Sequence, residues 1–200
     1  NPSIISRENK PFWELVGAIR SIIGEDKMLH VQTTAKTAEK MVEEAKLLQE
    51  KLGGAFFIKI PICEEGLKAT MMLNRMGIGV TMTAIFTPAQ ALMAAKAGAS
   101  FVAPYVNRLD NLGGDGIETV KKIQNILENN GFETQVLAAS FKNSHQVMEL
   151  CEYGVGCLTI ASEVIENLIK NANVTAAVND FVSDFESLCG KGKTMLNCEE

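Results

Sequence analysis

Six short apolar segments, each followed by a segment of helical periodicity, recur along the 200-residue chain. Their hydrophobicity is nearly continuous rather than alternating, which is typical of parallel strands covered on both faces. Such a strict alternation of strands and helices predicts a parallel sheet, either doubly wound or closed into a barrel. The predicted strands are Met28–Thr33, Phe56–Pro61, Gly79–Ile85, Phe101–Val106, Gln135–Ser140 and Cys157–Ala161.

The barrel is the better of these two architectures. No predicted strand is followed by a Gly-x-Gly-x-x-Gly turn, and the strand spacing is the unit size of a (β/α)8 TIM barrel. A closed barrel of this kind needs eight strands, whereas the chain supplies six. We therefore expect one α/β barrel domain over residues 1–200, with its first two strands missing, and a C-terminal amphipathic helix over residues 174–188 that is available for oligomer contacts.

The composition excludes several classes of protein. Hydrophobic residues make up 46% of the chain, enough for a large core, which excludes an intrinsically disordered protein. The net charge of -5 and the lack of a basic run give no electrostatic attraction to nucleic acid. No apolar stretch reaches the roughly 18–20 residues that span a bilayer, and the first ten residues do not resemble a signal peptide. We expect a cytoplasmic protein that binds neither nucleic acid nor membrane.

The cysteines and histidines give little support for a metal site. Five cysteines cannot all pair with one another, and no Cys-x-x-Cys or Cys/His spacing typical of zinc ligands occurs. The only histidines, His30 and His145, lie beside neither a cysteine nor a His-Glu pair. We expect free thiols in a reducing compartment, no metal and no cofactor.

Lys59 is the most unusual residue of the predicted strands, because it lies among large apolar residues at the end of Phe56–Pro61. Lysine is seldom buried without a partner, since desolvation of its ammonium group is costly. One interpretation is an ion pair with a neighbouring carboxylate. The other is a lysine whose pKa is lowered by an apolar pocket, leaving a free amine that forms a Schiff base with a carbonyl. Lys142 is a weaker candidate, since it follows the end of its strand, where a solvated lysine is the ordinary interpretation.

Other strand ends also carry polar residues. Inward-facing side chains alternate along a strand, which places Gln32, Thr83 and Tyr105 at rim positions corresponding to that of Lys59. Each could be a satisfied polar residue of the core, but their occurrence on separate strands favours one convergent site. Arg108 offers a planar fork for a phosphate and Ser140 a hydroxyl beside it. The residues alone thus predict a Schiff-base barrel enzyme that acts on a small phosphorylated carbonyl compound.

The same segments resemble the transaldolase family. The resemblance extends from Asn1 to about Gly190 and implies an eightfold barrel, a Schiff-base lysine and a decameric assembly. Motif by motif, it implies that Lys59 is the Schiff-base lysine, that Asn1 lies in a substrate-binding loop and that Thr83 lines the site. It further implies that Arg108 and Ser140 bind phosphate. The segments that carry it are Asn1–Ile5, Phe57–Pro61, Glu64–Leu67, Ala103–Arg108 and Leu137–Lys142.

Three positions distinguish the branches of the family. Transaldolases usually have Glu in place of Gln32, Phe in place of Tyr105 and Gly in place of Asn107. In the aldolase branch, the Gln and Tyr hold a water that relays protons. The resemblance therefore favours the aldolase branch.

The chain also departs from the family pattern. Cys63 replaces a Ser or Thr, where it would cap the following helix, and Cys157–Glu163 lacks a typical Leu-Pro pair. Family members have about two dozen residues before Asn-Pro-Ser, with two strands and an acid/base aspartate. Without them both edges of the sheet would be open, so we expect a chain that begins at Asn1 to be insoluble or inactive by itself.

The expected reaction is class I aldol chemistry without metal. The enzyme would cleave or form fructose 6-phosphate from dihydroxyacetone and glyceraldehyde 3-phosphate through Lys59. The first alternative is a transaldolase that transfers a dihydroxyacetone unit between sugar phosphates, and the second is a non-catalytic barrel that binds a phosphorylated metabolite. The expected partners are the sugar phosphate, dihydroxyacetone and further copies of the chain in a homo-oligomer.

Overall fold

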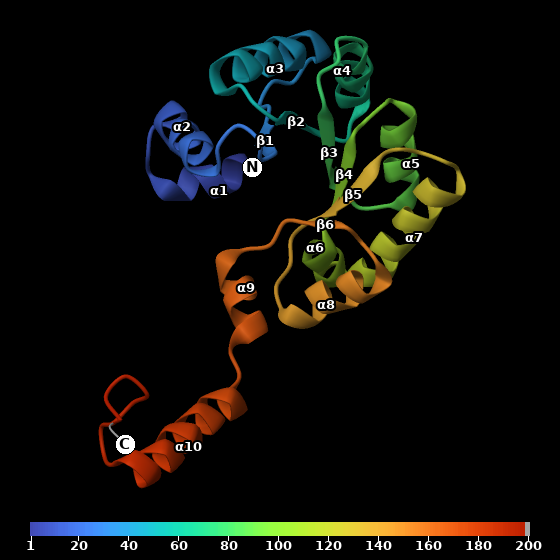
Figure 1. Ribbon diagram of the computed structural model, residues 1–200. Helices are drawn as coiled ribbons and strands as arrows, with labels where there is room; N and C mark the ends of the chain where they lie inside the picture. The colour runs from blue at the N-terminus through green and yellow to red at the C-terminus, as the bar shows by residue number, and fades with distance from the viewer. Residues whose placement is uncertain (199–200) are drawn as a thin grey trace. The chain divides into compact units, whose positions relative to one another are not determined.

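Six parallel strands form a single sheet in the order β1-β2-β3-β4-β5-β6, and the sheet curls into part of a barrel (Figure 1). The computed structural model describes residues 1–198. All six strands belong to the first of two compact units, Asn1–Ile160, and the second unit begins at Ala161. The strands are β1 Leu29–Gln32, β2 Phe56–Pro61, β3 Val80–Ile85, β4 Phe101–Pro104, β5 Gln135–Ala138 and β6 Cys157–Leu158.

Each predicted apolar segment contains a strand, and the bounds of β2 are those predicted. Four strands end earlier than predicted, so their expected extension to Thr33, Val106, Ser140 and Ala161 is wrong. In β4 the cause is local. Pro104 has no backbone N–H to donate to a neighbouring strand, and only an isolated bridge from Tyr105 to Ala139 follows before the chain enters a helix at Val106.

Helices follow every strand of the sheet, as expected of successive βα units. Each crossover helix of the first unit covers the outer side of the curled sheet (Figure 1). The helices of the first unit are α1 Pro2–Ile5, the short 3-10 helix η1 Ser6–Glu8, α2 Phe12–Ile23, α3 Ala38–Leu52, α4 Glu64–Arg75, α5 Pro88–Lys96, α6 Val106–Asn111, α7 Gly116–Asn129 and α8 Ser144–Tyr153.

The apolar core lies between the strands and these helices. Ile58 and Ile60 on β2, Leu73 on α4 and Met82 on β3 are all fully buried. Complete burial of such a side chain contributes roughly 1.5–3 kcal/mol. Because side chains alternate along a strand, Lys59 points to the opposite side of the sheet from Ile58 and Ile60. The core therefore fixes the direction of the lysine.

Several helix starts are determined by local sequence. The Thr87 hydroxyl accepts a hydrogen bond from the Gln90 N–H, and the Gln90 side-chain oxygen accepts one from the Thr87 N–H, with Pro88 at the first helical position. The Cys63 sulfur accepts from the Gly66 N–H at 3.3 Å, so the predicted cap at this position is confirmed. A Cβ on Gly66 would lie 2.2 Å from the Pro61 oxygen, so only glycine lets α4 begin this close to the end of β2.

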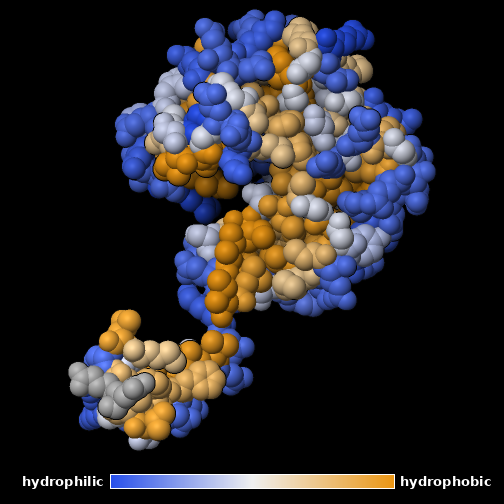
Figure 2. Space-filling view, viewed as in Figure 1, coloured by the Kyte–Doolittle hydropathy of each residue, from blue (hydrophilic) through white to orange (hydrophobic). Residues whose placement is uncertain are grey.

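The second unit consists of α9 Ser162–Ile169 and α10 Ala172–Cys189, which covers the residues for which the sequence predicts a final helix. None of the α10 residues is buried. Its large exposed apolar side chains are Val174, Val178, Phe181, Val182 and Leu188. Apolar surface over this helix is visible in the space-filling view (Figure 2).

Cys189 and Cys198 form a disulfide bond, with their Cα atoms 5.8 Å apart. The expectation of free thiols is therefore wrong for this pair, whereas Cys63, Cys151 and Cys157 are free. The local reason is the turn that follows α10. Gly190 has a φ of +103°, a conformation that glycine adopts without steric cost, and the chain can fold back toward the helix end.

Within residues 1–198, none of the helices combines the length and the apolar character required to span a bilayer.

Candidate active site

Lys59 lies on β2 near the carboxyl end of the strand, the end at which barrel enzymes place their active sites. In the parallel register it is opposite Gln32 of β1 and Thr81 of β3. Its side chain is only 8% exposed, and none of the ion pairs among residues 1–198 includes it. The carboxylate partner considered as one interpretation of the sequence is therefore not found among these residues.

Burial lowers the pKa of the Lys59 ammonium group. A lowered pKa increases the fraction of free amine near neutral pH, and the free amine is the form that attacks a carbonyl. A buried lysine without an ion-pair partner is therefore chemically suited to imine formation.

Gln32 and Asn1 lie together at the end of β1. The Asn1 side-chain amide donates to the Gln32 side-chain oxygen at 3.3 Å, and the Asn1 oxygen accepts from the Ser3 N–H at 2.9 Å, which caps α1. Asn1 and Gln32 were predicted site residues on separate motifs, and the fold brings them into contact. Because Gln32 is also the register partner of Lys59, this pair lies beside the lysine.

Thr83 and Tyr105 form a second contact between predicted site residues. Their hydroxyl oxygens are 3.0 Å apart, and both residues are buried. The register between β3 and β4 shifts after Thr83, where Ala84 has a φ of +58°. Bulges of this kind re-aim side chains next to functional sites. Phe86 packs against the Tyr105 ring edge-on at 5.6 Å and further fixes the phenol.

Arg108 and Ser140 lie on neighbouring segments after β4 and β5. The N–H of Asn107, the residue before Arg108, donates to the Ser140 carbonyl at 2.8 Å. The Arg108 guanidinium is exposed and lies 4.3 Å from the centre of the Tyr105 ring. Ser140 has a φ of +65°, a left-handed conformation that costs a non-glycine residue roughly 1–3 kcal/mol and that clusters at functional sites.

His30 is a residue of the barrel interior to which the sequence alone assigns no role. Its ring stacks on Phe57 at 5.0 Å and contacts Phe101 edge-on at 5.2 Å, while Nδ1 lies 2.8 Å from the Thr81 hydroxyl. Burial, and then the charge of Lys59, lower the His30 pKa to about 4. His30 is therefore neutral near pH 7 and adds no positive charge beside Lys59.

Two further polar residues, Gln146 and Asp110, were also missed at the sequence level. Their side chains form a 2.6 Å hydrogen bond between α8 and α6, adjoining the segments that carry Ser140 and Arg108. The only sequence signal is Asn143 followed three residues later by Gln146, a helix-start pattern. Lys142, the weaker Schiff-base candidate, is exposed, in agreement with its interpretation as a solvated lysine.

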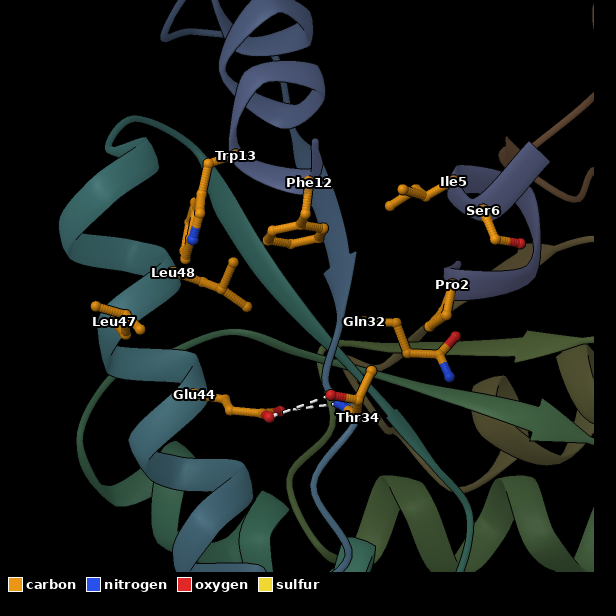
Figure 3. Close-up of a pocket in the computed structure, with 10 residues that line it drawn as sticks. All are labelled: Pro2, Ile5, Ser6, Phe12, Trp13, Gln32, Thr34, Glu44, Leu47 and Leu48. Atoms are coloured by element: carbon orange, nitrogen blue, oxygen red, sulfur yellow. Dashed lines mark hydrogen bonds between the residues drawn. The ribbon is translucent and has the colours of Figure 1, made fainter. Parts of the chain in front are cut away.

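A cavity of about 350 Å³ lies next to β1 (Figure 3). Of the site residues predicted from the sequence, only Gln32 lines this cavity. Lys59, Tyr105, Arg108 and Ser140 do not. The Glu44 carboxylate in the cavity already accepts hydrogen bonds from Thr34 and the Ala35 N–H. Most of the cavity surface is apolar, and the proposed Schiff-base and phosphate-binding residues do not line it. It is therefore not the site that we assign to a sugar phosphate. Its lining residues are Pro2, Ile5, Ser6, Phe12, Trp13, Gln32, Thr34, Glu44, Leu47 and Leu48.

No group of three or more His, Cys, Asp or Glu side chains that could hold a metal ion is found within the described part of the chain.

Two solved structures resemble the fold. One is described as native KDPGal, with a TM-score of 0.55 and 19% identity, over 77% of this chain and 66% of that chain. The other is a mandelate oxidase mutant with the monooxide FMN adduct, with a TM-score of 0.53 and 12% identity, over 76% of this chain and 52% of that chain. The chain thus spans about half to two thirds of the length of these structures. At such low identity the likeness concerns the α/β barrel-like fold alone.

The sequence model of the family described as Transaldolase/Fructose-6-phosphate aldolase matches residues 1–196, nearly the whole chain. The match covers all the segments that carry the resemblance in the sequence. The chain belongs to the transaldolase/fructose-6-phosphate aldolase family.

Proposed function

We propose that the protein is a class I aldolase that cleaves or forms fructose 6-phosphate through a Schiff base at Lys59. The observation that carries this proposal is a buried lysine at the carboxyl end of a barrel strand, with no carboxylate partner among the described residues. Family membership supports the same class of chemistry.

In the cleavage direction, the Lys59 amine attacks the substrate ketone, and loss of water gives a protonated imine. The imine nitrogen accepts the electron pair of the C3–C4 bond as that bond breaks and the C4 hydroxyl loses its proton. Glyceraldehyde 3-phosphate leaves, and the remaining enamine is protonated at carbon. Addition of water to the new imine releases dihydroxyacetone and regenerates the amine.

The neighbouring residues support these steps by position. Gln32 and Tyr105 orient the water that moves protons, and the Thr83 hydroxyl fixes the direction of the Tyr105 phenol. Asn1 binds the substrate beside Gln32. Arg108 and Ser140 bind the phosphate, which selects phosphorylated aldehydes.

Trapping with borohydride tests the role of Lys59. Reduction in the presence of dihydroxyacetone or fructose 6-phosphate is expected to attach one adduct per chain, located at Lys59 by peptide mass mapping. Lys59→Met has a similar volume and is expected to fold and to form no adduct. Lys142→Met serves as the matched control and is expected to form the adduct normally. An adduct on Lys142, or an undiminished adduct in Lys59→Met, would refute the assignment.

The second candidate function is transfer of a dihydroxyacetone unit, because the family includes transaldolases. The two reactions differ in the fate of the donor half. Incubation with fructose 6-phosphate alone is expected to release free dihydroxyacetone from an aldolase. A transaldolase would keep the dihydroxyacetone unit on Lys59 until an aldehyde acceptor is added, and would then release it as part of a new sugar phosphate. Gln32 and Tyr105 favour the first outcome.

A further inference from the structure

Gln146 is a buried polar residue on α8, 4% exposed, whose side-chain amide is used at both ends. Its Oε1 accepts from the Lys142 N–H at 2.8 Å. Its Nε2 donates to Asp110 Oδ2 at 2.6 Å and lies 3.3 Å from Asn107 Oδ1. One side chain thus connects the segment after β5 with two residues of α6.

The partner residues extend this connection to the proposed phosphate site. Asp110 Oδ1 accepts from the Gly116 N–H at 2.7 Å, which fixes the start of α7 against α6. The Asn107 N–H donates to the Ser140 carbonyl at 2.8 Å. Arg108 lies in α6 between Asn107 and Asp110, so the residues on both sides of it are held by hydrogen bonds.

Gln90 shows what an ordinary helix-start glutamine does in the same fold. Its Oε1 accepts from the N–H groups of Phe86 and Thr87, at 2.8 and 3.1 Å, at the start of α5. Among residues 1–198, no hydrogen bond connects its side chain with another helix. Gln146 forms the equivalent bond to Lys142 and also reaches across to α6, which a role in capping alone does not require.

We propose that Gln146 is a positioning residue that holds Ser140 and Arg108 in a fixed relation and thereby determines the affinity for phosphorylated substrates. This inference rests on the proposed function, which assigns these two residues to the phosphate. A divided binding site needs both halves in place before the ligand arrives, since ordering them on binding reduces affinity. Gln146 provides this order through α6 on one side and the Ser140–Lys142 segment on the other.

Gln146→Leu removes both ends of the connection with little change in volume. We expect its KM for fructose 6-phosphate to rise about tenfold, the effect of losing one hydrogen bond to a charged group. The addition of dihydroxyacetone to an unphosphorylated aldehyde is expected to change less than about twofold, because no phosphate takes part. The measured quantity is the ratio of these two effects.

A double variant tests whether the hydrogen bond itself is responsible. Gln146→Glu alone places a carboxylate against Asp110, and the ratio is expected to shift as in Gln146→Leu. Asp110→Asn combined with Gln146→Glu restores one donor and one acceptor with their direction reversed. This double variant is expected to recover most of the selectivity, which a side chain that merely filled space would not do.

Gln90→Leu is the matched control, because it removes a glutamine with the same capping geometry from the start of a different helix, α5. It is expected to lower thermal stability without changing the ratio of the KM effects. Equal losses with phosphorylated and unphosphorylated substrates in Gln146→Leu would overturn the proposal. So would an equal shift of the ratio in Gln90→Leu, or a double variant that recovers nothing.

The aldolase proposal and this inference can fail separately. If the wild-type protein does not turn over fructose 6-phosphate, the aldolase proposal fails, and titration calorimetry with inorganic phosphate then decides the positioning role. Weaker phosphate binding in both Gln146→Leu and Arg108→Ala, with Gln90→Leu unchanged, supports it. Absence of phosphate binding by the wild-type protein, or equal binding by wild type and Gln146→Leu, refutes it.

Discussion

The hydroxyl oxygens of Thr83 and Tyr105 lie 3.0 Å apart in the buried interior of the barrel, where the ends of β3 and β4 meet. The two residues are 22 positions apart in the chain, and the bulge at Ala84 lies directly after the threonine. The contact holds the phenol in one direction, which the proposed role of Tyr105 in orienting a reacting water requires.

Tyr105→Phe is expected to slow the release of free dihydroxyacetone relative to its transfer to an added aldehyde. The variant lacks the phenol that we propose orients the water, whereas an aldehyde acceptor needs no such water. The ratio of hydrolysis to transfer measures this effect. Tyr153→Phe is the matched control, since Tyr153 is the only other tyrosine and is exposed on α8. An unchanged ratio in Tyr105→Phe would remove the phenol from the proton relay.

Arg108→Ala is expected to weaken phosphorylated substrates about 10- to 150-fold, the effect of losing a charge-assisted contact of about 1.5–3 kcal/mol. Free dihydroxyacetone as donor is expected to be affected far less. Steady-state kinetics with both kinds of substrate measure the difference. Arg75→Ala, which removes an exposed arginine at the end of α4, is expected to be neutral. Equal losses for both substrates would indicate that Arg108 only supports the Tyr105 ring.

His30 is expected to make the folded protein less stable as the pH falls from about 6.5 to about 4. Burial, followed by the Lys59 charge, lowers its pKa in the folded state, so the unfolded state binds the proton more tightly in this window. The contribution of the neutral His30 ring to the free energy of unfolding is fully present above pH 6.5. Because the ring is only partly buried, solvent screening leaves a loss of about 1–2 kcal/mol.

His30→Phe keeps an aromatic ring against Phe57 and Phe101 and removes the titrating group. The free energy of unfolding in urea, measured at pH 7 and pH 4.5, is expected to fall less in this variant than in the wild type. Lys59→Met is expected to give a partial effect, because burial is the larger cause of the shift. The same pH-dependent loss in His30→Phe as in the wild type would contradict the prediction.

The apolar side chains of α10 are expected to bind a second copy of this chain in a homo-oligomer. Val174, Val178 and Val182 recur at intervals of four residues, and Phe181 lies beside them, so they form one exposed stripe on the helix. Phe181→Asp places a charge in that stripe and is expected to lower the molar mass measured by light scattering. Asp180→Asn on the same helix is the control. An unchanged mass in Phe181→Asp would exclude this face from assembly.

The sequence by itself determined the order and type of the elements, because the signals for them are local. The apolar segment Phe56–Pro61 became β2 with the predicted bounds, and Thr87 with Pro88 began α5. The same locality located Lys59 at a strand end, since alternation along one strand is enough to separate it from Ile58 and Ile60.

The tertiary structure alone decided the contacts between elements, because their partners are distant in the chain. The bond from Gln146 to Asp110 joins residues 36 positions apart, and no pattern in either helix predicts it. The left-handed backbone of Ser140 likewise depends on the neighbouring α6, whose Asn107 N–H binds its carbonyl. Cys189 and Cys198 paired because the turn at Gly190 brought them together. Side-chain type specifies local conformation, whereas packing between segments selects which polar groups meet.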